Sequence, residues 1–267
     1  MELNAGLNGI MVIVAAFVGG ACIGSFINAT AMRTVAEKKW WGNERSVCDT
    51  CGHELCARDL VPILSYSLLG GKCRYCGAKI GIRHFAAEII SGLLTAALAV
   101  RWGPSLALAL SLVILWLSLF NSMTDMENGF IYDVPAVALG IVGLGLRLAG
   151  GWPAVLEGIL GAALGFGFIA LIILIKPGGM GWGDAMLMIG IGGAVGWKYC
   201  IFCLYFGFLI GGIVILPLML KKKLKRKDAV PLGPFLAIGS LLTLFTGNVL
   251  VSRFAALIGS YPGWPWG

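Results

Sequence analysis

Residues 178–187 read GGMGWGDAML, and they place one acidic residue, Asp184, directly before a run of apolar residues. The chain around this stretch has few charges, because only 12% of its 267 residues are charged and 58% are hydrophobic. Its mean hydropathy is +0.90. An ordinary soluble domain has about 25% charged residues. We therefore interpret the chain as an integral membrane protein, in which a retained carboxylate requires an explanation.

Eight apolar stretches reach or approach the length of about 20 residues that spans a bilayer. Five of them are long, and they cover residues 9–32, 105–123, 154–175, 199–220 and 235–251. Three are shorter, and they cover residues 85–100, 134–148 and 185–197. The first stretch follows Glu2 without any basic residue, so we expect a retained helix rather than a cleaved signal peptide. The predicted fold class is an all-α polytopic membrane protein with about eight transmembrane helices.

Basic residues are distributed unevenly between these stretches, and such residues accumulate in cytoplasmic loops. With the amino terminus outside, 16 of the 20 lysines and arginines fall on the cytoplasmic side. They include the basic run Lys221–Lys227, which we expect to anchor the chain to anionic lipid headgroups. Topology and membrane lipids thus account for the net charge of +7, and we predict no nucleic-acid partner.

One long polar segment interrupts the apolar pattern. We therefore divide the chain into a first transmembrane helix (1–32), a cytoplasmic insert (33–83) and a helical membrane body (84–267). Within the body, Gly161 with Gly165 and Gly192 with Gly196 form G-x-x-x-G spacings. Such spacings allow close helix contact, so we predict that these glycines serve packing.

The insert contains two Cys-x-x-Cys pairs, formed by Cys48 with Cys51 and by Cys73 with Cys76. Two such pairs are typical of a four-thiolate zinc site. Two disulfides are the alternative, which the reducing cytoplasm disfavours. We predict a structural zinc knuckle that folds an insert too short to build its own core. Cys56 is either a spare thiol or a substitute ligand.

Several acidic residues lie near the apolar stretches, where ionisable groups are costly and therefore candidates for function. They are Glu88, Asp125, Glu127, Asp133, Glu157 and Asp184. Under the predicted topology, Asp125 and Asp184 lie at the same depth at the cytoplasmic edge. Two carboxylates in a low-dielectric setting share a proton, so one can activate a water while the other protonates a peptide carbonyl. We predict that Asp125 and Asp184 catalyse hydrolysis without a covalent intermediate.

Three neighbouring positions have simpler expected roles. Gly181 and Gly183 have no side chain, so we predict that they let a substrate strand approach Asp184. For Asp184 alone, the alternative role is that of a helix N-cap. Asp133 is expected to cap the helix whose first turn contains Pro135.

Together these motifs resemble the type IV prepilin peptidases, which are bifunctional leader peptidase/N-methyltransferases of the bacterial cytoplasmic membrane. The resemblance covers nearly the whole chain. The segments GSFINATAMR (24–33), RDLVPILSYSLLGGKCRYC (58–76) and PLGPFLAIG (231–239) are similar to segments of this family. The catalytic aspartates of the family match Asp125, eight positions before Asp133, and Asp184 in its Gly-x-Gly-Asp motif. Tyr132 departs from the family pattern, because many members have proline there.

The resemblance implies that the chain removes the short basic leader from type IV prepilin or pseudopilin precursors at the cytoplasmic face. It also implies methylation of the new amino terminus with S-adenosylmethionine, and we expect Asn28 and Glu88 to face the loop and assist this step. One alternative is a transporter or channel with a zinc-stabilised loop, in which Asp125 and Asp184 bind a cation or relay protons. Another is a peptidase that no longer methylates, since no S-adenosylmethionine motif is visible in the sequence.

Overall fold

The computed structural model describes residues 2–39, 45–221 and 230–257, and for residues 2–8 the backbone alone. Most of the predicted basic anchor, Lys221–Lys227, lies outside these ranges. Within them the chain forms helices, and its β-structure is limited to two isolated bridges. The chain divides into two compact units, residues 1–101 and 102–267.

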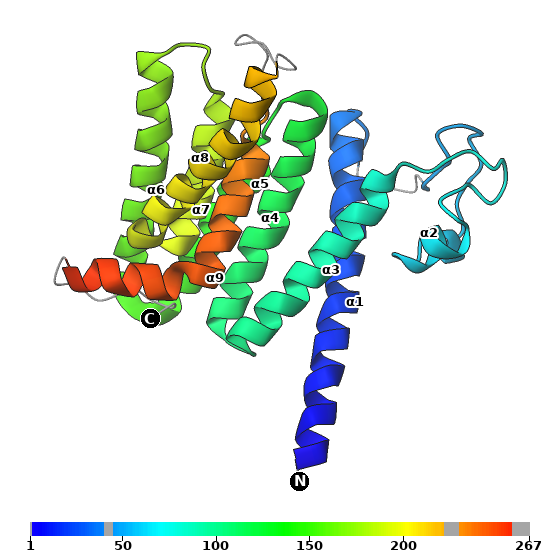
Figure 1. The fold of residues 1–267 in the computed structure, drawn as a ribbon, viewed down its shortest axis with the longest axis horizontal. Helices are drawn as coiled ribbons and strands as arrows, with labels where there is room; N and C mark the ends of the chain where they lie inside the picture. Colours follow the sequence, from blue (N-terminus) through cyan, green and yellow to red (C-terminus); the bar gives the residue numbers. More distant parts are fainter. Residues whose placement is uncertain (1, 40–44, 222–229, 258–267) are drawn as a thin grey trace. The chain divides into compact units, whose positions relative to one another are not determined.

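The first unit contains helix α1 (Glu2–Val35), the insert and nearly all of helix α3 (Ile82–Trp102) (Figure 1). The two helices pack through small residues. A Cβ atom at Gly20 would lie 2.5 Å from Thr95, and one at Gly24 would lie 2.5 Å from Ser91. Only glycine therefore allows this approach. Residues 84–101 belong to the same compact unit as α1 and the insert. The predicted division into a first helix, an insert and a membrane body remains a prediction.

Short elements organise the insert between α1 and α3. These are the 3-10 helix η1 (Ala57–Asp59), the helix α2 (Leu64–Leu68) and the two isolated bridges. One bridge joins Val47 to Glu54 and the other joins Lys72 to Lys79. Each bridge therefore closes a loop around one Cys-x-x-Cys pair.

The second unit is a bundle of six longer helices with one 3-10 turn. Its elements are α4 (Leu106–Asn128), α5 (Asp133–Arg147), η2 (Leu148–Gly150), α6 (Gly151–Ile175), α7 (Trp182–Val195), α8 (Trp197–Leu220) and α9 (Gly233–Leu257). Helix α7 contacts α4, α5, α6, α8 and α9, so it occupies the centre of the bundle (Figure 1). Most of its residues are buried. This position explains why α7 is apolar on all sides except at Asp184.

Glycines allow α6 and α7 to touch through their backbones. A Cβ atom added to Gly161 would overlap the backbone of Gly192, and one added to Gly192 would overlap the backbone of Gly161. One turn along, a Cβ at Gly165 would lie 2.6 Å from the carbonyl oxygen of Met188. The predicted packing role of these spaced glycines is confirmed.

Each of the eight predicted spans coincides with a helix, the first with α1 and the other seven with α3 to α9. By length and composition, six segments of the described chain can cross a membrane. The number of such segments is smaller than the eight predicted spans because α5 and α6 form one apolar segment, Asp133–Ile175, and because α7 is short. With its 14 residues, α7 is about 21 Å long, which is less than the bilayer core of about 30 Å. The all-helical, multi-pass class is confirmed, whereas the count of eight spans remains a prediction.

A buried ionic cluster joins the end of α7 that lies opposite Asp184 to its neighbours. Arg147 is fully buried and donates hydrogen bonds to the carbonyl oxygens of Ala154 (2.6 Å) and Ala194 (3.2 Å). It also pairs with Glu157 at 3.1 Å, and Lys198 pairs with the other carboxylate oxygen of Glu157 at 3.0 Å. Buried charges require such partners, so the cluster fixes the ends of α5, α6, α7 and α8 relative to one another.

Candidate active site and metal centre

Asp125 lies in the last turn of α4, which ends where Gly129 adopts a φ of 72°. The Asp125 side chain is buried, and its Oδ2 accepts a hydrogen bond from the backbone N–H of Gly233 at 2.8 Å. Gly233 is the first residue of α9, so the positive end of that helix faces the carboxylate. A Cβ at Gly233 would lie only 2.9 Å from Oδ2, which means that this contact requires glycine.

Asp184 is the third residue of α7, and Gly181 occupies the N-cap position. The alternative role of Asp184, a helix N-cap, is therefore wrong in position, although the side chain does make a cap-like hydrogen bond. Its Oδ2 accepts the backbone N–H of Gly181 at 3.1 Å, as an acidic residue at this position commonly does. The residue is only 8% exposed, so its carboxylate lies inside the bundle.

The fold brings the two aspartates together. Ile131, in the loop between α4 and α5, packs beside both helix starts. A Cβ at Gly183 would lie 2.8 Å from the Ile131 side chain, and one at Gly233 would lie 3.3 Å from it. The two carboxylates are thus enclosed by the starts of α7 and α9 and by this loop.

The two glycines predicted to bind substrate differ in their surroundings. Gly183 packs against Ile131, so its missing side chain already serves the fold. Gly181 is less confined, because the nearest atom to an added Cβ would be Asp184 Oδ2 at 3.6 Å. Its hydrogen bond to Asp184 gives it a direct link to the carboxylate. A substrate-binding role for both glycines remains a prediction.

Sequence reasoning missed Asn121, which lies one turn before Asp125 on α4. Asn121 is fully buried, and its Oδ1 accepts the backbone N–H of Tyr132 at 3.2 Å. Within the described chain its Nδ2 has no hydrogen-bond partner, and neither has the hydroxyl of Ser118 one turn earlier. Buried polar groups normally have partners, so these atoms are available to a water or to a substrate group. The i−4 spacing from Asp125 was the signal that could have identified Asn121.

Asp133 is the first residue of α5, where Tyr132 rather than Asp133 holds the N-cap position. Its exposed carboxylate still lies in the first turn, near the positive end of the helix. The predicted capping role is therefore wrong by one position.

The four cysteines of the two Cys-x-x-Cys pairs form a cluster in the insert. Their Sγ atoms all lie within 4.8 Å of one another, and those of Cys48 and Cys76 are 3.9 Å apart. A tetrahedral site with Zn–S bonds of about 2.3 Å places its sulfurs about 3.8 Å apart. All eight cysteines of the chain are free thiols, so the disulfide alternative is wrong. This group could hold a metal ion.

Local interactions shift the thiol pKa values of the cluster in both directions, since the pKa of Cys48 is lowered and that of Cys76 is raised. The backbone N–H groups of Cys51 and Thr50 lower the pKa of the Cys48 thiol to about 6, which favours the thiolate form that binds metals. Beside the cluster, Arg74 donates a hydrogen bond to Asp59 at 2.7 Å and lowers the pKa of that carboxyl. Cys56 lies outside the four-thiol group and instead accepts a hydrogen bond from the Tyr75 hydroxyl at 3.5 Å.

Two family models match the chain. Residues 18–102 match the bacterial peptidase A24 N-terminal domain, and residues 112–216 match the type IV leader peptidase family. Three similar proteins are each named a prepilin leader peptidase/N-methyltransferase. The protein from Bacillus subtilis (strain 168) is 32% identical, and the match covers 89% of this chain and 96% of the relative. The protein from Burkholderia pseudomallei (strain K96243) is 31% identical, and the match covers 89% of this chain and 86% of the relative. The protein from Pseudomonas aeruginosa is 26% identical, and the match covers 90% of this chain and 92% of the relative. No solved structure matches the chain significantly.

Proposed function

The chain belongs to the type IV leader peptidase family, and on this premise we propose that it removes the leader from type IV prepilin or pseudopilin precursors, with Asp125 and Asp184 as its catalytic pair. One observation carries the assignment of the pair. Two buried carboxylates from distant parts of the sequence lie at helix ends that pack around the same residue, Ile131. Membrane proteins keep such costly groups at sites of function.

The hydrogen bonds suggest how each carboxylate is used. In Asp125 and in Asp184, a backbone N–H group holds one oxygen, Oδ2. Within the described chain the second oxygen of each has no hydrogen bond, and it can therefore share a proton or hold a water. One carboxylate takes a proton from the water as it attacks the peptide carbonyl, and the other protonates the carbonyl oxygen and then the leaving amine.

The proposed setting follows from the charge distribution and from the family. The chain is a multi-pass protein of the bacterial cytoplasmic membrane, with its amino terminus outside and the aspartate pair at the cytoplasmic side. A basic leader would remain in the cytoplasm, because lysine and arginine accumulate on that side of the membrane. The peptide bond after the leader would then meet Asp125 and Asp184 at the membrane edge. The names of the relatives favour this function over that of a transporter or channel.

The four-cysteine cluster would hold a structural zinc ion. Four thiolates complete a tetrahedral site and leave no position for water, so such an ion supplies folding energy rather than a reactive hydroxide. The names of the relatives support a second activity, N-methylation of the new amino terminus. S-adenosylmethionine would supply the methyl group.

The function is tested by incubating the purified full-length chain in detergent with a type IV prepilin and measuring product masses. We expect a pilin shortened by its leader, and a further methyl group when S-adenosylmethionine is added. A mature pilin without a leader serves as the control and should not be shortened. A prepilin that stays uncut while the enzyme retains the spectrum of a folded helical protein would contradict the proposal.

A further inference from the structure

Ile131 lies between the two helix starts that surround the catalytic aspartates. On one side it meets α7, because a Cβ atom at Gly183, the residue before Asp184, would lie 2.8 Å from Ile131 Cβ and 3.2 Å from its carbonyl oxygen. On the other side the tip of its side chain meets α9. A Cβ atom at Gly233 would lie 3.3 Å from Ile131 Cδ1 and 2.9 Å from Oδ2 of Asp125. Ile131 therefore contacts both helix starts beside the two carboxylates.

The loop that carries Ile131 is fixed to the end of α4. On one side of Ile131, the backbone N–H of Tyr132 donates a hydrogen bond to Oδ1 of the buried Asn121 at 3.2 Å. On the other side, the backbone N–H of Phe130 donates to Oδ1 of Asn128 at 3.0 Å. Both acceptors belong to α4. The helix that carries the first aspartate thus also sets the position of Ile131.

The length of the Ile131 side chain separates the starts of α7 and α9. Its backbone and Cβ rest against the first of these helices, and its Cδ1 rests against the second. Protein interiors are close-packed, so neighbours shift or a cavity remains when such a side chain is shortened. Any shift reaches a carboxylate, since Asp184 follows Gly183 and since the Gly233 N–H donates to Asp125 at 2.8 Å.

Building on the proposed function, we propose that Ile131 is a positioning residue for peptide cleavage, whose side chain sets the separation of the starts of α7 and α9 and thereby the placement of Asp125 and Asp184. Ile131 is apolar and takes no part in proton transfer, so it acts only through the two aspartates. Hydrolysis by two carboxylates requires both to reach one water and one peptide bond. A displacement of about 1 Å in such an arrangement can cost about 100-fold in rate.

Substitutions that change the length of this side chain test the proposal. Ile131→Val removes Cδ1 alone, Ile131→Ala removes every atom beyond Cβ, and Ile131→Leu keeps a δ carbon. We would measure kcat and KM for prepilin cleavage by the purified full-length protein in detergent, below the melting temperature of every variant. We expect kcat to fall at least tenfold for alanine, about threefold for valine and less than about twofold for leucine. KM should stay within about twofold, because a misplaced catalytic group affects the transition state rather than substrate binding.

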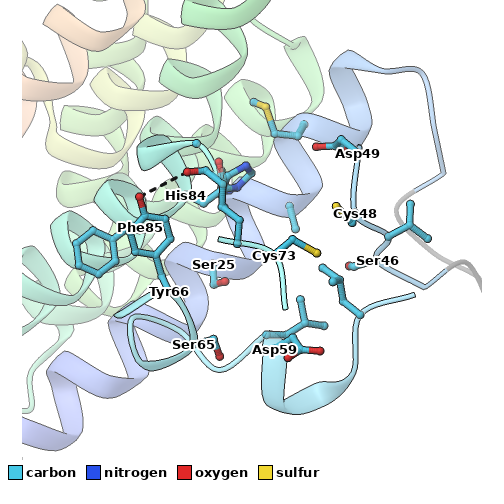
Figure 2. Close-up of a pocket in the computed structure, with 18 of the residues that line it drawn as sticks. Ser25, Ser46, Cys48, Asp49, Asp59, Ser65, Tyr66, Cys73, His84 and Phe85 are labelled. Carbon is cyan, nitrogen blue, oxygen red and sulfur yellow. Dashed lines mark hydrogen bonds between the residues drawn. The ribbon is translucent and has the colours of Figure 1, made fainter. Parts of the chain in front are cut away.

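Two controls separate positioning from stability. Val251 is fully buried at the opposite end of α9, so Val251→Ala should lower the melting temperature and leave kcat unchanged. In the first unit, the rings of Tyr66 and Phe85 stack with centroids 4.7 Å apart beside a cavity (Figure 2). Neither the aspartates nor Ile131 line this cavity, so Tyr66→Phe should cleave at the wild-type rate.

The same measurements distinguish the two proposals. If Ile131→Ala keeps the wild-type kcat, or if its loss appears in KM alone, the positioning role is overturned and the peptidase function stands. The same holds if Ile131→Leu is as slow as Ile131→Ala, or if Val251→Ala loses as much rate as Ile131→Ala. If wild type fails to cleave, the proposed function itself is overturned.

Discussion

Replacing Gly233 with alanine should damage the active site without touching either aspartate. The added Cβ would lie 2.9 Å from Oδ2 of Asp125, whereas ordinary contacts begin at 3.4 Å. The start of α9 or the carboxylate must therefore move by about 0.5 Å, because both sides of the contact are buried. This movement stretches the 2.8 Å hydrogen bond between the Gly233 N–H and Asp125.

A hydrogen bond to a charged group contributes about 1.5–3 kcal/mol, and small displacements of catalytic groups are costly. We therefore expect Gly233→Ala to reduce the initial rate of prepilin cleavage at least tenfold, measured by leader loss on a gel. The matched control is Gly212→Ala in α8, where an added Cβ meets no atom within 4 Å. Cleavage by that control should stay within about twofold of wild type, since a helical alanine is favourable. Wild-type activity in Gly233→Ala would refute the role assigned to the contact with α9.

Three further predictions concern other parts of the molecule. Cys73→Ser should lower bound zinc, measured by mass spectrometry of the purified protein, well below one ion per chain, whereas Cys56→Ser should retain it; equal zinc in both would contradict the four-thiol site. Asn121→Leu should slow cleavage about tenfold at unchanged expression, because it removes a buried amide available to water or substrate, and an unaffected rate would exclude that role. Glu157→Gln should lower the free energy of unfolding by about 3 kcal/mol in denaturant unfolding. This is the low end for a broken buried ion pair, because the Glu157 side chain is 24% exposed. A cost below that of a surface substitution such as Asp133→Asn would count against the ionic cluster.

Hydropathy and spacing predicted much of this molecule, because the features concerned are local in the sequence. Apolar runs located each long helix, since backbone groups in a membrane must be paired within the segment. The spacing of Cys48, Cys51, Cys73 and Cys76 indicated one cluster, and these thiols do lie together. The family resemblance is confirmed by the similarity to the leader peptidases.

The missed features depend on contacts between distant segments. Gly233 is 108 residues from Asp125, and nothing in its local sequence shows that its N–H meets that carboxylate. The cluster of Arg147, Glu157 and Lys198 likewise needs the ends of several helices to meet. A helix N-cap was the alternative role for Asp184, but the helix begins two residues earlier, at Trp182. Helix ends are the least certain feature of a sequence pattern.

The most direct test of the catalytic pair is cleavage of a prepilin in membranes containing wild type, Asp125→Asn or Asp184→Asn at equal protein levels. Asparagine keeps the size of each side chain but can neither accept nor release the proton, so each variant should lose at least 100-fold in rate. Glu127→Gln, an exposed carboxylate two residues from Asp125, should cleave as wild type does. Wild-type cleavage by either aspartate variant would contradict the two-aspartate site.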